Sequence, residues 1–538
     1  MSGVIPTYEG NRVYTSYKSR KSDNFDVIVI GSGMGGMSAA SALSQLGKRV
    51  CVLERHSIPG GFTHMFLRNG FSFDAGVHAV GEMDAKKGAS YRMLNYLSGG
   101  KHEIKMNSLG ENYEEMFFPG NFSIKFPNTP DKFRAALVEK FPNEVAAIDA
   151  YFALCKEAIK TVPQYMAFKS MPLAVGKTLE KLYFLFKKKY WQVTTEAVLN
   201  SINASKKLQT VLTAQWGYYG SLPSESPFLM HALIYWHFRW GAYYPVGGSK
   251  EIAANILNVV LKNGGEVLCQ SNVKEVILEG NKATGVELAD GTKLYAPIII
   301  SAAGAKTTVN KLLPQTHQNS WWTKEIKKLE SSFAYICLNL GFEGDISKVG
   351  ASKTNWWLFE TWDEYKYWDP TDKNSIPEIL YISFPSLKDP LHKTDGDKVQ
   401  HTGEVVTFVP YKIFEKWNKT TRKNREQDYL EFKQEITERI LKQMRLKFPE
   451  LMKLLVFSEL STPLTAEHYV NVDSGAIYGL AATVPRFTSS ALRPRTPIKG
   501  FYLTGVDTVS CGVAGAMNSG ILTAAAIDSK VIKNLRPN

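Results

Sequence analysis

The amino-acid sequence predicts an α/β fold built on a parallel sheet, and three observations near the N-terminus lead to this prediction. Residues 25–30 are almost entirely apolar, as in a strand that is buried on both faces of a parallel sheet. A glycine-rich turn from Gly31 to Gly36 follows, and it leads into an Ala- and Ser-rich segment that ends near Leu46. Residues 49–54 form a second apolar run. A strand, a G-x-G-x-x-G turn, a helix and a strand within about 30 residues indicate a Rossmann-like dinucleotide-binding unit.

Each part of the glycine motif has a physical role in binding a dinucleotide. Gly31 permits the tight turn, Gly33 lets the backbone approach a pyrophosphate, and Gly36 lets the helix pack on the strand. The positive N-terminal end of the helix then faces the phosphates. Glu54 ends the second strand, where a carboxylate can bind ribose hydroxyls and disfavours a 2′-phosphate. The predicted contacts of this loop are Gly31, Ser32, Gly33, Met34, Gly35 and Gly36, together with Glu54.

A second glycine pair follows the acidic residue and favours FAD over NAD. The segment from Arg55 to Thr63 contains Gly60 and Gly61. It resembles the double-glycine extension of flavoprotein oxidases, desaturases and reductases, which simple NAD dehydrogenases lack. The usual pattern places Arg after the glycine pair. Phe62 stands there instead, which removes a cation from the phosphate or flavin side. The predicted contacts of this segment are Arg55, Gly60, Gly61, Phe62 and Thr63.

Two later segments resemble the remaining FAD motifs of the same class, known as the GR2 type. Asp507 offers a carboxylate to the ribityl or pyrophosphate region, with a helix N-cap as the alternative role. A glycine-rich helix after Cys511 would point its N-terminus at the flavin pyrimidine. A covalent flavin link through Cys511 is conceivable, but we expect a small buried residue there and non-covalent FAD. The strand block with Val273 resembles the adenine-side segment of the same fold. The predicted contacts of that block and of the C-terminal segments are Val273, Ala303, Gly304, Asp507, Gly515, Ala516 and Met517.

The motif-bearing blocks are separated by two long aromatic-rich insertions, which predicts two interleaved domains instead of three or four consecutive ones. We expect an irregular N-terminal arm at 1–24. The FAD-binding domain is predicted at 25–83, 244–305 and 466–538, and an α+β substrate-binding domain at 84–243 and 306–465. Predicted strands span 266–269, 273–279, 283–288 and 293–300. Predicted helices include an amphipathic one at 427–447 and a Gly/Ala-rich one that follows residue 505 and runs to about residue 535.

The composition narrows the class of protein and its compartment. Apolar residues make up 44% and charged residues 21%, as in ordinary globular proteins, which excludes a disordered or fibrous chain. Five widely spaced Cys without a C-x-x-C pattern argue against a zinc cluster or a disulfide framework. We find no signal peptide and no run of 18 apolar residues for a transmembrane helix. We therefore expect a cytoplasmic or peripheral membrane protein, on the endoplasmic reticulum face if the source is eukaryotic.

The net charge of +13 favours an anionic partner, and one segment concentrates it. Residues 155–190 carry eight Lys and two Glu among apolar side chains, and they end in Lys187-Lys188-Lys189. Basic and apolar residues in one stretch indicate an interfacial anchor on an anionic membrane. The alternative is a solvated helix face in the substrate domain. No nucleic-acid-binding module accompanies the charge, so we expect no nucleic-acid partner.

Several longer stretches resemble one family more specifically than the glycine motifs do. They are Phe73 to His78 (F-D-A-G-V-H), Gly241 to Ser249, Ile382 to Pro390, Ser461 to Thr465, Gly475 to Gly479 and Leu503 to Gly512. Over about 25–530 the chain resembles the phytoene desaturase, carotenoid isomerase and retinol saturase superfamily, with the retinol saturases closest. Gly505-Val506 departs from their Gly-Gln. The resemblance implies a two-domain FAD enzyme that saturates or isomerises a C=C bond of a retinoid, carotenoid or related polyene. It leaves the electron donor unknown.

Flavin-dependent reduction of a C=C bond needs a hydride and a proton donor, whereas isomerisation needs no net electrons. Four polar residues near the predicted flavin segments are catalytic candidates: His78, Tyr244, Tyr478 and Glu467. The alternative role for each is a hydrogen-bonded group at a domain junction. No metal site is expected, because the histidines lack metal-ligand spacing. Two other functions stay open: an amine or other heteroatom oxidase on the same scaffold, and a non-catalytic polyene carrier with a vestigial flavin site.

Overall fold

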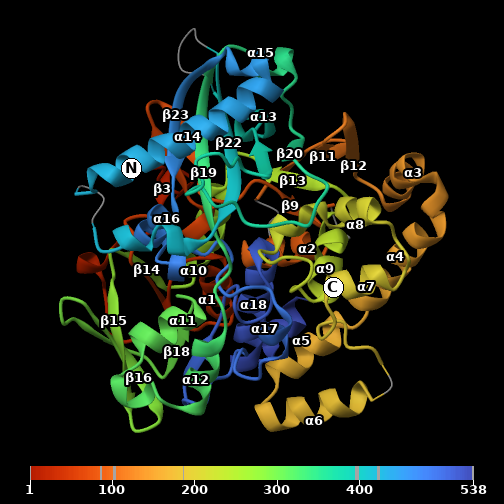
Figure 1. Cartoon of the computed structure of the whole chain (residues 1–538). Helices are drawn as coiled ribbons and strands as arrows, with labels where there is room; N and C mark the ends of the chain where they lie inside the picture. The colour runs from red at the N-terminus through yellow and green to blue at the C-terminus, as the bar shows by residue number, and fades with distance from the viewer. Residues whose placement is uncertain are drawn as a thin grey trace.

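Two large β-sheets organise the computed structural model of the chain, with helices packed around and between them (Figure 1). The structure describes residues 2–84, 88–100, 104–185, 187–393, 399–420 and 424–535. In Figure 1 the parallel sheet with α1 and α18 occupies the lower centre, and the second large sheet rises above it. The two sheets are built from alternating stretches of the chain.

The parallel sheet has six strands in the order β24-β18-β5-β6-β14-β4. Their bounds are β4 (Thr15–Ser16), β5 (Val27–Ile30), β6 (Val50–Glu54), β14 (Glu266–Cys269), β18 (Ile298–Ser301) and β24 (Phe501–Leu503). Val27 and Val29 pack into the core on one face, while Ile28 and Ile30 pack into the core on the other. Burial on both faces explains the uninterrupted apolar runs. The predicted α/β fold with a parallel sheet is confirmed.

Helices cover one face of this sheet and a small antiparallel sheet covers the other. The helices are α1 (Met34–Ser44), α2 (Ala89–Leu97), α10 (Lys250–Lys262), α18 (Gly512–Ile527) and α19 (Lys530–Asn534). The other face meets β15 (Val273–Glu279), β16 (Lys282–Leu288), β17 (Lys293–Tyr295), α11 (Ala305–Thr307) and α12 (Trp321–Lys328). Helices α1 and α18 touch through small residues, since a Cβ on Gly520 would lie 2.5 Å from the Gly35 carbonyl oxygen.

The second large sheet has seven strands in the order β12-β11-β20-β21-β22-β19-β23. Their bounds are β11 (Asn112–Phe118), β12 (Phe122–Pro127), β19 (Ala334–Glu343), β20 (Asn355–Phe359), β21 (Ile379–Ser383), β22 (Gln400–Val409) and β23 (Leu455–Ser461). Only the β11–β20 pair is parallel. Helix α14 (Gln427–Lys447) lies on one face and buries Ile436, Ile440 and Met444, which confirms the predicted amphipathic helix with the same bounds.

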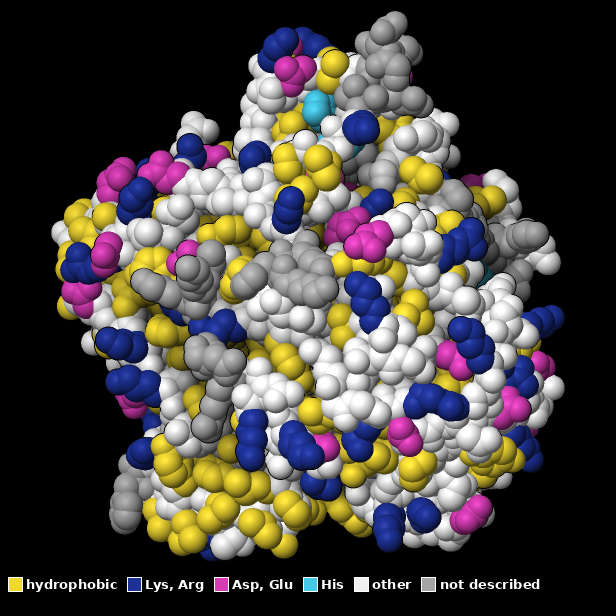
Figure 2. Space-filling view, turned by 180° about the vertical axis from the view of Figure 1, so that it is seen from behind, with side chains coloured by type: hydrophobic (Ala, Val, Ile, Leu, Met, Phe, Trp, Pro, Cys, Tyr) yellow, Lys and Arg dark blue, Asp and Glu magenta, His cyan; other side chains and the backbone are white. Residues whose placement is uncertain are grey.

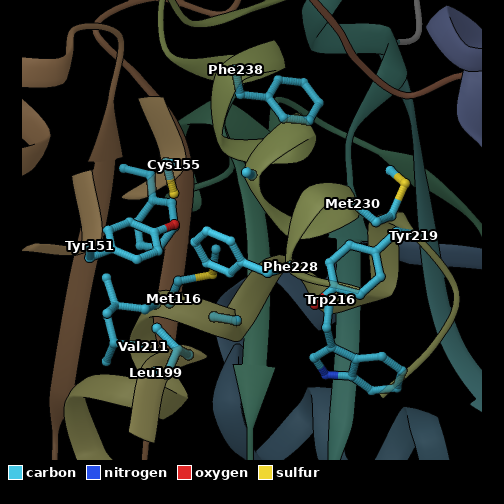
Figure 3. Packing of buried hydrophobic residues seen from close by; sticks show 14 of the residues in the cluster. Met116, Tyr151, Cys155, Leu199, Val211, Trp216, Tyr219, Phe228, Met230 and Phe238 are labelled. Carbon is cyan, nitrogen blue, oxygen red and sulfur yellow. The ribbon is translucent and has the colours of Figure 1, made fainter. Parts of the chain in front are cut away.

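The opposite face of the seven-stranded sheet meets an aromatic core to which several helices contribute. These helices include α3 (Pro130–Lys140), α4 (Val145–Ile159), α5 (Val162–Ser170), α7 (Thr195–Asn200), α8 (Lys206–Thr213) and α9 (Phe228–Phe238). Helix α6 (Leu173–Tyr183) lies outside this core and packs against α5. Figure 3 shows part of this core, with Tyr151 beside Cys155 and with Trp216 near Tyr219. The Tyr151 hydroxyl lies 2.9 Å from His231 Nε2, so the core includes a buried polar pair.

Smaller sheets and several short helices complete the fold. One small sheet holds β1 (Ser2–Gly3), β7 (Met65–Arg68) and β8 (Phe71–Asp74), and another holds β9 (Val80–Gly81), β10 (Met106–Ser108) and β13 (Ala242–Pro245). A hairpin pairs β2 (Thr7–Tyr8) with β3 (Asn11–Arg12). The short helices are α13 (Pro385–Lys388), α15 (Pro449–Met452), α16 (Pro463–Val470) and α17 (Val484–Thr488).

Three predicted elements differ from the structure. The single strand predicted over 293–300 is two strands in different sheets, β17 and β18, separated by Ala296 and Pro297, because proline cannot donate a ladder hydrogen bond. The helix predicted to run to about residue 535 ends at Ile527, and α19 follows as a separate helix. The N-terminal arm, predicted as irregular, contains four short strands, and β4 pairs with β14 at the edge of the parallel sheet.

The division into two interleaved domains stays a prediction, and the strand positions can be compared with its boundaries. Five of the six parallel strands lie in the segments assigned to the FAD-binding domain, and β4 lies in the arm. The predicted boundary between residues 243 and 244 falls inside β13, which pairs with β9 and β10. Within the described residues, we find no helix long and apolar enough to cross a bilayer.

Candidate active site

One continuous cavity is lined from both large sheets. At one end its walls are the turns after β5, β6 and β18 and the start of α18. At the other end its walls are apolar and aromatic side chains of α9 and of the seven-stranded sheet, including Leu233, Trp357, Tyr381 and Phe408. Turns at the carboxyl ends of parallel strands are the usual place for a nucleotide. The cavity therefore joins a nucleotide-type end to an apolar end.

The first glycine loop leaves the backbone bare on one side and packs tightly on the other. A Cβ on Gly36 would lie 2.0 Å from the Gly31 carbonyl oxygen, so the helix could not approach the strand with any larger residue. A Cβ on Gly33 would meet no protein atom within 4 Å, which leaves space above the turn. Gly31 has a φ of +98°, a conformation that favours glycine. These are the positions where the motif predicts a turn, a bare backbone and a helix contact.

The Ser32 side chain joins the two glycine loops through Glu54. Glu54 Oε2 accepts hydrogen bonds from the Ser32 backbone N–H at 3.1 Å and from its hydroxyl at 2.6 Å. Glu54 Oε1 accepts one from the His56 backbone N–H at 2.8 Å, and Gly60 N–H donates to Ser32 Oγ at 2.9 Å. Glu54 lines the cavity and is held in one orientation, while Ser32 lies behind it.

The Asp507 carboxylate connects three segments that are distant in sequence. Its Oδ2 accepts a hydrogen bond from Ala305 N–H at 2.7 Å, and its Oδ1 accepts one from Leu480 N–H at 2.7 Å. The N-cap of α18 is Cys511, so Asp507 does not cap the helix that follows it. The N-termini of α1 and α18 both reach the cavity, and the positive end of each favours an anionic or electron-rich ligand group.

Most of the predicted cofactor contacts line the cavity, and the rest lie directly behind it. The lining residues are Gly31, Gly33, Met34, Gly35, Glu54, Arg55, Gly61, Phe62, Thr63, Val273, Ala303, Gly304, Asp507, Gly515 and Ala516. Outside the lining are Ser32, Gly36, Gly60 and Met517. The bare Gly33, the oriented Glu54 carboxylate and the two helix N-termini make a cradle whose chemistry fits a dinucleotide.

The four predicted catalytic residues occupy different positions relative to the cavity. His78 lines it with 14% of its side chain exposed, and its Nδ1 lies 2.9 Å from Glu404 Oε2. Tyr478 also lines it, and burial raises the pKa of its phenol. The buried Tyr244 lies outside the lining and donates to Asp74 Oδ2. Glu467 on α16 is also outside the lining, and its Oε2 accepts a hydrogen bond from Tyr411 at 2.9 Å.

Motif reasoning did not find a group of buried charged residues at the cavity wall and behind it. Glu114 and Glu404 are both fully buried, on β11 and β22. Lys388 at the end of α13 is equally buried, and burial lowers its pKa to about 8. Burial also raises the pKa of Glu114 to about 7 and that of Asp74 to about 6. A lone charge within an apolar strand, such as Glu404 before Val405 and Val406, was the available signal.

A family model matches almost the whole chain. The model is described as "Flavin containing amine oxidoreductase", and it matches residues 34–528. The chain belongs to this family. The family match supports a flavin as the cofactor of this protein. The predicted flavoenzyme superfamily is confirmed.

Relatives and solved structures agree with this assignment. The chain is 31% identical over 532 residues to the all-trans-retinol 13,14-reductase of Danio rerio, covering 95% of this chain and 86% of that protein. It is 27% identical over 535 residues to a chloroplastic prolycopene isomerase of Daucus carota, covering 94% and 80%. An oxidoreductase from Methanosarcina mazei superposes with a TM-score of 0.61 at 16% identity, over 92% of this chain and 98% of that chain, which shows a shared fold.

Proposed function

We propose that this protein is an FAD-dependent oxidoreductase that saturates or isomerises a C=C bond of a conjugated polyene lipid. The observation that carries the proposal is the near full-length similarity to retinol 13,14-reductases and, more weakly, to prolycopene isomerases. The cavity supports it, because a nucleotide-type cradle opens into a wall of apolar and aromatic side chains. A long apolar ligand would be buried along this wall, and burial of apolar area is what holds such ligands.

We propose that FAD binds without a covalent link. Glu54 would hold the adenosine ribose, Gly33 and the N-terminus of α1 would face the pyrophosphate, and the N-terminus of α18 would face the flavin ring. The Cys511 thiol lies 3.6 Å from the Tyr219 carbonyl oxygen and 3.8 Å from Met230 Sδ. Burial raises the pKa of Cys511 to about 11, so it remains a protonated thiol and not a thiolate nucleophile.

The residues of the cavity wall have roles in positioning and in excluding water. Bound flavin supplies a hydride to, or transiently accepts electrons from, the conjugated system. Tyr478, Phe62 and Tyr335 line the cavity close to the glycine loops and would shield the reacting region from water. His78 contacts Glu404 and would present its imidazole to the flavin or substrate. Tyr244 would act indirectly by holding the Asp74 carboxylate, and Glu467 has no part in this proposal.

Anaerobic reduction of the purified holoprotein, followed by addition of polyenes, tests this function. All-trans-retinol and prolycopene are the probes, with dithionite as the reductant and flavin absorbance as the signal. We expect reoxidation of the flavin with loss of conjugation, or a cis/trans change at constant mass. Absence of flavin from the protein, or no change in either probe, would contradict the proposal. Rapid reoxidation by oxygen in the presence of an amine would instead indicate an oxidase.

We further propose that α6 rests on an anionic membrane. Val175, Leu179 and Leu182 recur at helical spacing and are 51%, 39% and 59% exposed, and Leu185 follows at 59%. Figure 2 shows an apolar patch at the lower left, where the turn from the view of Figure 1 brings α6. Exposed Lys177, Lys181, Lys187 and Lys188 lie in the same segment. Apolar and basic side chains together are typical of an interfacial anchor.

The structure also shows which residues of 155–190 are buried and so cannot contact a membrane. Phe184 is buried against Trp191, and Lys169 is buried and donates to the Leu492 carbonyl oxygen, so neither residue is available to a membrane. Phe186 lies outside the described residues. Helix α5 packs against α6 and places Met166 in the cavity wall, so the anchor lies next to a wall of the substrate cavity. A lipid substrate could then enter from the membrane side.

Vesicle sedimentation tests the anchor. Substituting Lys187, Lys188 and Lys189 by Glu should weaken binding to anionic vesicles, since each basic residue near the surface contributes about 1 kcal/mol. The control replaces the exposed Lys324, Lys327 and Lys328 of α12 by Glu, which changes the net charge equally. Equal binding of the two variants would remove the anchor proposal.

A further inference from the structure

A row of polar side chains crosses the apolar face of the seven-stranded sheet. Glu114 on β11 is opposite Asn355 on β20, and Glu404 on β22 is opposite both Ser383 on β21 and Asn339 on β19. We call Glu114, Asn355, Ser383, Glu404 and Asn339 the polar row. All five side chains are buried, and each comes from a different strand.

The polar row lies next to the residues of the seven-stranded sheet that form the cavity wall, and Glu404 belongs to both. Two residues along each strand, the paired positions are Met116, Trp357, Tyr381, Val406 and Cys337. The last four of these line the cavity. Side chains two residues apart on one face of a strand are about 7 Å apart. Glu404 itself lines the cavity, and the other four members of the polar row lie directly behind the wall against which a substrate would lie.

Lys388 supplies the ammonium group of this region. Its Nζ donates to Asn355 Oδ1, to Ser383 Oγ at 2.7 Å and to the His78 carbonyl oxygen at 2.9 Å. It thereby bridges two members of the polar row and connects them to the loop that carries His78. The Lys388 ammonium lies close enough to the Glu114 and Glu404 carboxyls to compensate negative charge on them.

The buried charges of this region do not balance unless a proton is retained. Three buried carboxylates, Asp74, Glu114 and Glu404, share one buried ammonium, Lys388, and one imidazole, His78. Uncompensated charge in a low-dielectric interior is costly, so the group that is hardest to ionise keeps its proton. Burial raises the pKa of Glu114 to about 7 and that of Asp74 to about 6. Glu114 is therefore the carboxyl that holds a proton near neutral pH.

Tyr218 connects Glu114 with the cavity. Its hydroxyl donates to Glu114 Oε1, while Asn355 Nδ2 at 3.2 Å and the Trp357 indole N–H also donate to this carboxylate. Tyr218 is partly exposed and lines the cavity beside Tyr381, with ring centroids 5.8 Å apart. Burial raises the pKa of the Tyr218 phenol, so it is a neutral donor.

We propose that Tyr218 delivers a proton to the substrate in the cavity and that Glu114 replaces it. This inference rests on the proposed function. In saturation, the Tyr218 hydroxyl turns from Glu114 Oε1 to the substrate, and its O–H bond breaks as a C–H bond forms on one alkene carbon. The other carbon would receive the hydride and its two electrons from flavin that an external reductant has reduced. The Glu114 proton then moves to the Tyr218 oxygen, and the Glu114 carboxylate regains a proton from water. In isomerisation the carbon-bound proton returns along the same path, with no net electrons.

The groups that face Glu114 set the expected pH dependence. They are Lys388, Tyr113, Tyr218 and Tyr381, and the three phenols have their pKa values raised by burial. Glu114, with a pKa of about 7, changes charge in the window between Asp74, at about 6, and Lys388, at about 8. The acid form is the active one, so the rate of proton delivery should fall as the pH rises through about 7.

Infrared spectroscopy of the holoprotein tests the stored proton without any substrate. We expect a carbonyl band of a protonated carboxylic acid that disappears as the pH rises through about 7. Glu114→Gln should remove this band. Glu115→Gln, at the neighbouring half-buried position on the same strand, should leave it unchanged. Trp357→Phe removes one donor to the carboxylate and should move the transition to higher pH. A band that survives Glu114→Gln overturns the proposal.

Rapid mixing of reduced enzyme with all-trans-retinol or prolycopene tests delivery. Tyr218→Phe should lower the rate of C–H bond formation about 100-fold, the ordinary size of a general-acid effect. Glu114→Gln should abolish the fall in rate near pH 7, whereas Glu115→Gln should retain it. A Tyr218→Phe enzyme with the wild-type rate and pH profile overturns the proposal, as does loss of the same step in His78→Gln alone. If wild-type protein changes neither probe, the proposed function fails, and the infrared band and its Trp357→Phe shift still decide whether Glu114 holds the proton.

Discussion

The two ends of the cavity are built in different ways. At the nucleotide end, the cavity is lined by the backbone of two glycine loops, Gly31 to Gly36 and Gly60-Gly61. The close contact between Gly36 and Gly31 joins residues that are near each other in sequence. At the apolar end, the polar row takes one side chain from each of five strands, from Glu114 to Glu404. The first end tolerates few residue types because space is absent. The second end depends on a balance of charges that only the folded sheet assembles.

The largest effect is expected where the backbone contact is closest. Gly36→Val places a side chain where even a Cβ would lie 2.0 Å from the Gly31 carbonyl oxygen, so we expect loss of the folded flavin-binding state. The matched variant is Gly33→Ala, whose Cβ would meet no protein atom within 4 Å. It should fold and bind FAD about tenfold more weakly, a difference of about 1.4 kcal/mol. For both variants, soluble yield measures folding, and flavin absorbance and FAD titration measure FAD binding. Wild-type flavin content in Gly36→Val would refute the idea that steric exclusion defines this end.

A second large effect is expected at the other end from removing the buried ammonium. Lys388→Met leaves the buried Glu404 and Asp74 carboxylates without their ammonium counter-charge, and breaking such a buried set costs about 3–5 kcal/mol. The thermal unfolding midpoint of the holoprotein should therefore fall. Lys393→Met, an exposed position five residues later, is the control and should leave the midpoint unchanged. Equal midpoints for the two variants would show that the polar row does not depend on charge balance.

A smaller effect is expected from pH alone. Because burial raises the pKa of Glu114 from 4.5 to about 7, the folded protein binds a proton that the unfolded chain releases in this window. Stability from this group is present below about pH 4.5 and is lost as the pH rises to about 7, by up to roughly 3 kcal/mol. The unfolding midpoint of Glu114→Gln should change less over this window than that of wild type. Parallel pH curves for the two proteins would contradict the assignment of the proton to Glu114.

The cofactor end could be predicted from sequence because its chemistry is local. The turn after β5, the carboxylate at the end of β6 and the glycine-rich start of α18 each combine a motif with the secondary structure that presents it. Side-chain roles were less predictable. Tyr244 was expected near the flavin and instead holds Asp74 from behind the cavity wall, and Glu467 pairs with Tyr411 away from the lining. Proximity to a motif in sequence does not specify the direction of a side chain.

The sequence by itself determined the parallel sheet, the flavin family and the glycine loops that line one end of the cavity, since apolar periodicity and glycine positions are constraints between near neighbours. Only the tertiary structure decided which charges meet. Glu114 and Glu404 are 290 positions apart, and strand register brings them to one level of the sheet, where the end of α13 places Lys388 against Asn355 and Ser383. Register depends on the packing of both sheet faces and on the connections between strands, which no local pattern encodes. The burial that changes the pKa values of Glu114 and Lys388 exists only after that packing has formed.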